Sequence, residues 1–281
     1  MTLYMINLDR AADRMARMQR LLDSERIAFE RISAVDGRGL DPETLAAWSH
    51  RHADGSLILS VGEVGILMSQ RQAWRRIADS GEPGVVFEDD IHLADGARDL
   101  LADLCWLPAD ADIVKIETTG RTVAISRRGI AVAPGLKTRS VTISRLRSAH
   151  LGAAGYIITP EAAGMLLDNV GRCDRAVDHV IFDPASPLFA RLRIYQMVPA
   201  LCIQDQFQTM GSIGLGGEIV RAWALEKKKR KRTLFEKVSR EIGRFGAQAG
   251  FVLAGLPFNP LADRRNLKIP FAGMETVRDG S

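Results

Sequence analysis

Three consecutive carboxylates, Glu88, Asp89 and Asp90, are the residues whose types and spacing most directly suggest chemistry in this chain. Neighbouring carboxylates repel one another unless a cation or a basic group compensates their charge. Mg²⁺ and Mn²⁺ prefer oxygen ligands and commonly take one or two from a protein, leaving the others to phosphate and water. The cluster therefore predicts a divalent metal ion shared with a diphosphate. Solvated loop acids, or acids at the start of a helix, would give the same pattern.

Strands and helices must position these acids. The acids directly follow a short apolar run, Val85–Phe87, which is typical of a buried strand. A helix is expected upstream, because Ser60-Val-Gly-Glu63 has the spacing of a capping box and apolar residues recur behind it at helical intervals. Further helices are expected at residues 11–22 and from Thr159-Pro160 onward. The other expected strands cover residues 3–8, 28–35, 113–116 and 155–158.

Alternating strands and helices predict an α/β domain with a mainly parallel, Rossmann-like sheet flanked by helices. Ligands of such sheets bind outside the carboxyl ends of the strands. Asn7, Asp9 and Arg14 follow the first expected strand and Asp36 follows the second, so we expect them beside the acidic cluster, in contact with a nucleotide. Two of them have a structural alternative, since Asp9 could cap the next helix and Asp36 with Gly37 could form an ordinary turn.

The composition is that of one large domain with a tail. The chain has 281 residues, of which 46% are hydrophobic, enough for a sizeable core. Its three cysteines lie far apart and predict neither a disulfide framework nor a thiolate metal site, which fits a reducing compartment. The first residues lack the pattern of a signal peptide, and no stretch approaches the roughly 20 apolar residues that cross a bilayer. We therefore expect a cytoplasmic protein.

The basic residues are concentrated near the C-terminus. Residues 226–244 hold nine Lys or Arg against three Glu, and the net charge of the whole chain is +4. We expect a catalytic domain at 1–210 and a basic, partly helical tail at 211–281. The run Lys227–Arg232 beside an apolar stripe predicts attachment to an anionic membrane surface, with a solvated helix as the alternative. We expect no specific nucleic acid, because the body shows no nucleic-acid-binding module.

A second basic segment lies in the middle of the chain. Residues 119–149 contain seven Arg or Lys and no acid. Guanidinium groups suit carboxylate and phosphate groups, so this segment would attract an acidic ligand. A solvated loop would have the same composition.

Several blocks in order along residues 1–206 resemble glycosyltransferase family 25, the lipooligosaccharide and lipopolysaccharide galactosyltransferase-like proteins. One departure is Gln70, which stands after Ser69 where the family usually has His. The matching blocks are Ile6-Asn-Leu-Asp9 with Arg14, Ala34-Val-Asp-Gly37, Leu59-Ser-Val-Gly-Glu-Val-Gly-Ile66, Phe87-Glu-Asp-Asp90, Ile113-Val-Lys-Ile-Glu-Thr118, His150-Leu-Gly-Ala-Ala-Gly-Tyr-Ile-Ile158, Val177-Asp-His179, and Pro199-Ala-Leu-Cys202 with Gln204.

The resemblance implies a GT-A type fold and metal-dependent transfer of a sugar, galactose or a related hexose, from a UDP-sugar with inversion. It implies a cell-surface glycan as acceptor, such as a lipid-linked lipooligosaccharide, lipopolysaccharide or capsule precursor. By the same resemblance Asp90 and Glu88 would bind Mn²⁺ or Mg²⁺, Glu88 would alternatively bind ribose, and Asp89 would orient the site. Glu63 is a further candidate for donor binding, although its capping box is a sufficient structural reason for it.

The transfer needs a base that takes the proton of the acceptor hydroxyl. Asp178 and Glu117 are the candidates, and His179 is a weaker one. Asp178 lies between apolar residues, and its structural alternative is an ion pair with Arg172 or Arg175. Two other classes of protein stay open: a metal-dependent enzyme of phosphate chemistry, and a glycosyltransferase-like protein that binds a nucleotide or glycan without turnover.

Overall fold

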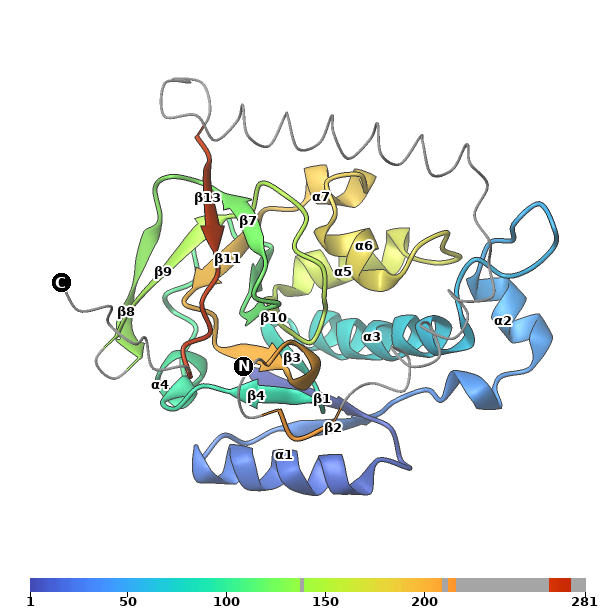
Figure 1. Cartoon of the computed structure of the whole chain (residues 1–281), viewed down its shortest axis with the longest axis horizontal. Helices are drawn as coiled ribbons and strands as arrows, with labels where there is room; N and C mark the ends of the chain where they lie inside the picture. Colours follow the sequence, from blue (N-terminus) through green and yellow to red (C-terminus); the bar gives the residue numbers. More distant parts are fainter. Residues whose placement is uncertain (137–138, 209–211, 216–262, 274–281) are drawn as a thin grey trace.

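An eight-stranded sheet forms the centre of the molecule (Figure 1). The computed structural model describes residues 1–136, 139–208, 212–215 and 263–273. The sheet has the order β2-β1-β3-β10-β5-β11-β9-β8. Its strands are β1 (Thr2–Asn7), β2 (Glu30–Ser33), β3 (Gly84–Glu88), β5 (Ile113–Lys115), β8 (Ile130–Leu136), β9 (Arg139–Arg145), β10 (Gly155–Ile158) and β11 (Ile194–Val198).

The strand directions confirm part of the predicted sheet. β1 pairs in parallel with β2 and β3, placing Met5 between Arg31 and Phe87. β11 is parallel to β5, but β10 runs antiparallel to both β3 and β5, and β9 antiparallel to β11 and β8. Most strands therefore point the same way, as in a Rossmann-like sheet, with two reversed strands among them.

Helices cover both faces of this sheet (Figure 1). Leu3 and Met5 of β1 pack with Met18 and Leu22 of α1 (Ala12–Ser24), whereas Tyr4 points to the opposite face. That face is covered mainly by α3 (Val61–Ser80), α5 (Pro160–Asn169) and α6 (Val177–Phe182). Successive side chains of a strand point to opposite faces, so one buried strand serves both layers. The remaining helices are η1 (Gly37–Gly39), α2 (Pro42–Trp48), α4 (Ala97–Leu101), α7 (Pro187–Arg191) and η2 (Asp205–Phe207).

Local sequence determines where the main helices begin. Ser60 accepts a hydrogen bond from the Glu63 amide, and the Glu63 carboxylate accepts one from the Ser60 amide, so the predicted capping box of α3 is confirmed. Thr159 caps α5, which has proline in its first turn as expected. α3 ends at Ser80 and is capped by Gly81, whose φ of 69° is favourable for glycine.

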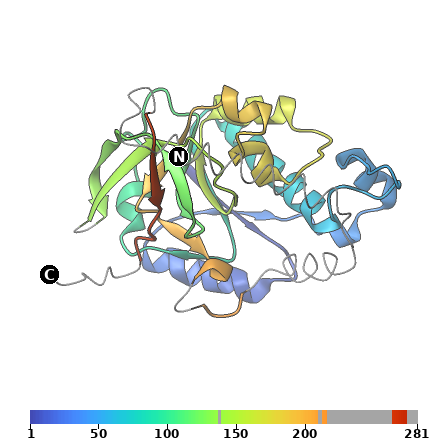
Figure 2. The same cartoon turned by 45° about the horizontal axis from the view of Figure 1, so that its top comes forward.

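Two small sheets extend the body beside the central one. The first has the order β4-β12-β6, made of β4 (Ile91–Leu93), β12 (Cys202–Gln204) and β6 (Glu117–Thr118). β7 (Thr122–Ile125) pairs with β13 (Arg265–Lys268), and both views place these strands side by side (Figures 1 and 2). Most of the basic segment 119–149 thus forms strands β7, β8 and β9, so the solvated-loop interpretation of it is wrong.

The C-terminal part of the chain returns to this body. Ile269 is buried, its carbonyl accepts a hydrogen bond from Thr118 Oγ1 at 2.8 Å, and Phe271 bridges to Ala200. Residues 263–273 therefore pack with the residues assigned to the catalytic domain, a contact that a boundary at residue 210 does not anticipate. The basic segment 226–244 lies outside the described residues, so its helical and membrane-binding character stays a prediction. Among the helices described, none is long and apolar enough to span a bilayer.

Candidate active site

The three acids occupy the turn that joins β3 to β4. Glu88 is the last residue of β3 and half-buried, while Asp89 and Asp90 are only 7% and 8% exposed. The turn is fixed by its backbone, because the Glu88 amide donates to Ala154 O at 3.1 Å and the Asp205 amide donates to Asp90 O at 2.8 Å. The acids thus lie at the carboxyl end of a buried strand, as the sequence predicts.

Asp89 is bound by polar side chains of the protein. Its carboxylate accepts a hydrogen bond from Asn7 Nδ2 at 2.6 Å and forms an ion pair with Arg14 at 3.1 Å. Asn7 ends β1, and its side-chain oxygen in turn accepts a hydrogen bond from Arg31 Nε at 3.0 Å. Asp89 therefore ties the turn to β1 and α1.

Glu88 and Asp90 have amide partners in place of cationic ones. Gln204 Nε2 lies 3.2 Å from Asp90 Oδ1 and 3.4 Å from Glu88 Oε2, and Gln70 Nε2 lies 3.3 Å from Glu88 Oε1. Neither acid forms an ion pair with a Lys or Arg of the residues described here. The two carboxylates therefore share the Gln204 amide group as a hydrogen-bond donor, and neither has an ion-pair partner among these residues.

This arrangement alters the acidity of both groups. Burial and the charge of Asp89 raise the pKa of Asp90 to about 6. Burial, followed by the charges of Asp90 and Glu117, raises the pKa of Glu88 well above its ordinary value. A divalent cation would relieve the same repulsion. The pair therefore fits a metal ion that takes two ligands from the protein.

The remaining ligands of such an ion would come from elsewhere. The described part of the chain brings together no three His, Cys, Asp or Glu side chains able to hold a metal. Mg²⁺ typically keeps several waters and binds substrate phosphates, so a two-carboxylate site suits it.

Glu117 lies behind this pair and is fully buried. One of its oxygens accepts hydrogen bonds from the amides of Ala154 and Gly155, at 2.7 and 3.0 Å, and lies 3.4 Å from Lys115 Nζ. Burial raises the pKa of Glu117, and the Lys115 charge opposes this rise. Glu117 thus has no surface exposed to a ligand, whereas Asp178, the other predicted base, is only half-buried.

Asp178 lies in the first turn of α6 and is half-buried. Its two oxygens accept hydrogen bonds from the amides of Gly152, at 3.0 Å, and His179, at 2.8 Å. The alternative pairing is not seen: Arg172 donates to Ser49 O, and Arg175 pairs with Asp174. His179 lies 3.1 Å from Asp183.

The other predicted donor residues have structural partners. Asp9 pairs with Arg31 at 2.5 Å, and it does not cap α1, whose N-cap is Ala11. Asp36 caps η1 through the Arg38 amide, and Glu63 completes the capping box of α3. The structure thus gathers Asn7, Arg14 and the three acids at one place, with Glu117 behind them and Asp178 joined through the Gly152 loop.

A comparison with protein families decides which class of protein this site belongs to. The model of glycosyltransferase family 25, described as an LPS biosynthesis protein family, matches residues 1–181. The chain belongs to glycosyltransferase family 25. The matched segment contains every predicted site residue, from Asn7 to Asp178.

Relatives of this family 25 chain act in bacterial glycan biosynthesis. It is 29% identical over 266 residues to the lacto-N-neotetraose biosynthesis glycosyltransferase LgtE of Neisseria gonorrhoeae, covering 87% of this chain and 90% of that protein. It is 34% identical to LgtB of Neisseria meningitidis serogroup A, over 62% of this chain and 65% of the relative. The lipooligosaccharide biosynthesis protein lex-1 of Haemophilus influenzae is 30% identical, over 66% and 63% respectively.

Several polar residues near the site of this family 25 chain were not predicted from the sequence to have a role in it. Gln70 and Gln204 donate hydrogen bonds to the acids. In the sequence, Gln70 was notable only as a departure from the family pattern, and Gln204 only as part of a matching block. Lys115 interrupts the apolar run Ile113–Ile116, which is a usable signal for a buried polar role. His150 contacts Gln196 at 2.7 Å, and burial lowers its pKa to about 3, so it is neutral.

Residues 212–215, which follow η2 in the chain, lie beside the same site. Asp205 accepts hydrogen bonds from the amides of Ile213 and Leu215, at 2.9 and 2.8 Å, and contacts His92 at 2.7 Å. Burial would raise the pKa of Asp205, but these hydrogen bonds lower it to about 2. Arg14, which pairs with Asp89, donates to Leu215 O at 2.7 Å. Residues 212–215 are thereby held next to the acidic turn.

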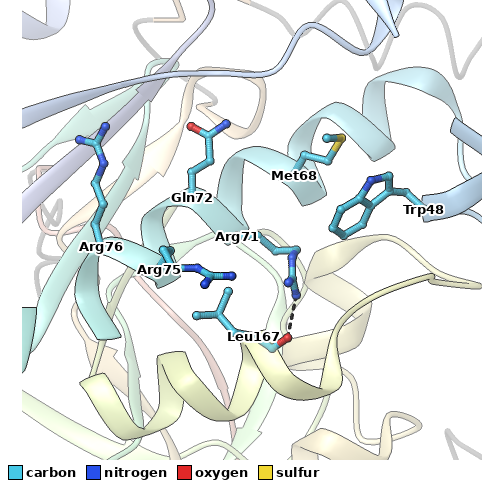
Figure 3. A pocket seen from close by; sticks show the side chains of 7 residues that line it. All are labelled: Trp48, Met68, Arg71, Gln72, Arg75, Arg76 and Leu167. Atoms are coloured by element: carbon cyan, nitrogen blue, oxygen red, sulfur yellow. Dashed lines mark hydrogen bonds between the residues drawn. The ribbon is translucent and has the colours of Figure 1, made fainter. Parts of the chain in front are cut away.

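A hollow of about 520 Å³ lies elsewhere in this family 25 chain, between α2, α3 and α5 (Figure 3). Its central residue, Arg71, donates to Leu167 O at 2.9 Å and to Val170 O, and lies over the Trp48 ring. Arginine near a helix C-terminus satisfies carbonyls that have no helical partner. Arg71 thus attaches the end of α5 to α3. The hollow is lined by Trp48, Met68, Arg71, Gln72, Arg75, Arg76 and Leu167, none of which is a predicted site residue.

Proposed function

We propose that this chain is a metal-dependent, inverting glycosyltransferase that moves galactose or a related hexose from a UDP-sugar to a hydroxyl of a lipooligosaccharide or related precursor. The observation that carries the proposal is the Glu88–Asp90 pair, two carboxylates without a cationic partner among the described residues. Relatives named for lacto-N-neotetraose and lipooligosaccharide biosynthesis support the acceptor class.

The protein's part at the donor is to hold oxygen ligands in place. When bound to Asp90 and Glu88, Mn²⁺ or Mg²⁺ would stabilise the negative charge of a leaving diphosphate. Asn7 and Arg14 keep Asp89 in position, and this would hold the neighbouring carboxylates in place for a metal ion. Gln204 donates to both ligands, which limits their rotation.

Asp178 is the residue proposed to accept the proton of the acceptor hydroxyl. It is half-buried, it has no Lys or Arg partner among the described residues, and its position is fixed by two backbone amides. A single displacement with such a base inverts the configuration at the anomeric carbon. Glu117 is proposed to support the Gly152 loop, because its carboxylate binds the amides of Ala154 and Gly155.

The donor assignment is tested by thermal unfolding with UDP-, GDP-, CMP- and dTDP-sugars, each with Mn²⁺ or with a chelator. Ligands that bind the native state raise its melting temperature. We expect a response to a UDP-sugar that requires Mn²⁺ and disappears in Asp90→Asn, while Asp168→Asn, a change of an exposed acid on α5, keeps it. An unchanged response in Asp90→Asn would show that the donor site is elsewhere.

A further inference from the structure

Three fully buried polar side chains lie behind Glu88 and have no part in the chemistry proposed above. Gln70 and Trp74 belong to α3, one turn apart, and Tyr156 belongs to β10. Trp74 Nε1 lies 2.7 Å from Tyr156 Oη, and Tyr156 Oη lies 2.6 Å from Gln70 Oε1. Polar groups so deeply buried are costly unless each has a partner, and here each does.

The direction of these hydrogen bonds follows from the chemistry of the groups. An indole N–H can only donate, so the Tyr156 oxygen accepts from Trp74. The single hydroxyl proton of Tyr156 is then available to Gln70, and the Gln70 side-chain oxygen accepts it. Burial raises the pKa of the Tyr156 phenol, so this proton stays in place at neutral pH.

The orientation of the Gln70 amide is thereby set. Its NH₂ group faces the other way and donates to Ala153 O at 3.2 Å and to Glu88 Oε1 at 3.3 Å. A flipped amide would place its oxygen against the Glu88 carboxylate and its NH₂ group against the Tyr156 hydroxyl. The Tyr156 hydroxyl proton would then have no acceptor, and two acceptor oxygens would face each other at Glu88, so the observed orientation is the stable one.

Glu88 depends on this partner for one of its oxygens. The NH₂ group of Gln204 donates to the other oxygen, at 3.4 Å, and also to Asp90. Among the three acids, Gln70 forms a hydrogen bond with Glu88 alone. The aromatic ring of Tyr156 is itself held by an edge contact with Phe182, at 6.1 Å between ring centroids.

We propose that Trp74, Tyr156 and Gln70 form a hydrogen-bond relay of fixed direction that holds the Glu88 carboxylate in the orientation in which it binds the donor and its metal ion. The three are positioning residues, since none of them reaches the surface. The inference rests on the proposed function only in naming the donor and metal ion as the ligands of Glu88. The relay itself consists of hydrogen bonds within the protein.

The relay is tested first by calorimetric titration of UDP-galactose with Mn²⁺ into the full chain. Tyr156→Phe removes only the hydroxyl, and we expect affinity to fall about tenfold in a protein whose circular dichroism is unchanged. Gln70→Leu should lose at least as much. Gln70→His should stay within about threefold of wild type, because a neutral imidazole accepts from Tyr156 on one nitrogen and donates to Glu88 from the other. Wild-type affinity in folded Tyr156→Phe and Gln70→Leu would overturn the relay.

A second measurement needs no nucleotide. The indole N–H resonance of Trp74 is assigned by its absence in Trp74→Phe. We expect Glu88→Gln and Gln70→Leu to shift it, while the indole resonance of Trp106, which donates to Leu100 O, stays in place. An unmoved Trp74 resonance in both variants would refute the relay. Failure of the wild type to bind UDP-galactose would instead refute the proposed donor, and the indole resonance would still decide the relay.

Discussion

At the scale of single residues, adjacent acids of one turn have opposite surroundings. Asp89 is paired with Arg14 and Asn7, whereas Asp90 is buried beside another carboxylate and a neutral amide. A composition of three acids in a row gives no means of distinguishing them. The distinction depends on which side chains from β1, α1 and β12 reach each one, and this is known only from the fold.

The surroundings of Asp90 predict a pH-dependent stability of the metal-free protein. Its folded pKa of about 6 lies above the ordinary value of 3.8, so ionisation opposes folding. This cost is absent below about pH 4, develops between pH 4 and 6, and is complete above pH 6, where it is at most about 3 kcal/mol. We expect Asp90→Asn to raise the melting temperature at pH 8 in chelator and to leave it nearly unchanged at pH 4.

Asp89→Asn is the matched control for that prediction. It removes an ion pair and leaves Arg14 partly buried without a charged partner, so we expect a loss of about 1–3 kcal/mol at pH 8. The two substitutions should therefore act in opposite directions in thermal unfolding. A loss of stability in both at pH 8 would contradict the account of Asp90.

At the scale of elements, the loop from His150 to Gly155 connects the two halves of the site. Gly152 O accepts from Lys115 at 2.5 Å, Gly152 N donates to Asp178, and Ala154 binds both Glu88 and Glu117. Gly152 has a φ of +102°, and a Cβ there would collide with the Glu117 carboxylate. The glycine is required by both its backbone angle and its close approach to Glu117.

We predict that Gly152→Ala destabilises the protein by more than about 2 kcal/mol, through strain and the displaced Glu117. Gly164→Ala is the control, because this glycine lies within α5, an added Cβ meets no atom within 4 Å, and the substitution should stabilise the protein by up to about 1 kcal/mol. Denaturant unfolding measures both. Equal effects of the two substitutions would contradict the proposed role of the loop.

The elements were predictable to different degrees. α3 and α5 have their start signals in the local sequence, and β1 and β3 contain short apolar runs, so all four were expected near their observed bounds. The antiparallel direction of β10 was not predictable, because an apolar run has the same appearance in either direction. The hydrogen bonds of Trp74 and Gln70 were not predictable either. Helical spacing indicates which residues of a helix are buried, but not which of them form hydrogen bonds with each other or with a neighbouring strand.

At the scale of the whole molecule, residues 263–273 return to pair with β7 and to cover Ala200. The pairing of β13 with β7 joins residues at least 140 positions apart in the chain, and no local sequence pattern predicts it. The intervening basic run lies outside the described residues, and its attachment to membranes is predicted from charge alone.

We predict that the full chain binds vesicles containing anionic lipid, and that replacing the six residues Lys227–Arg232 with Gln weakens this binding by at least about tenfold, since each basic group contributes about 1 kcal/mol. Co-sedimentation at low and high salt measures the effect, with neutral vesicles as control. Equal binding of both proteins to anionic vesicles would contradict the predicted attachment.

The central claim is that Glu88 and Asp90 hold a divalent ion together with the donor diphosphate. Its most direct test is Mn²⁺ binding followed by electron paramagnetic resonance, with and without UDP, in the wild type, Glu88→Gln, Asp90→Asn and the control Asp168→Asn. We predict that UDP increases the bound Mn²⁺ in the wild type and the control and that both site variants lose this increase. Undiminished, UDP-dependent Mn²⁺ binding in Glu88→Gln and Asp90→Asn would contradict the claim.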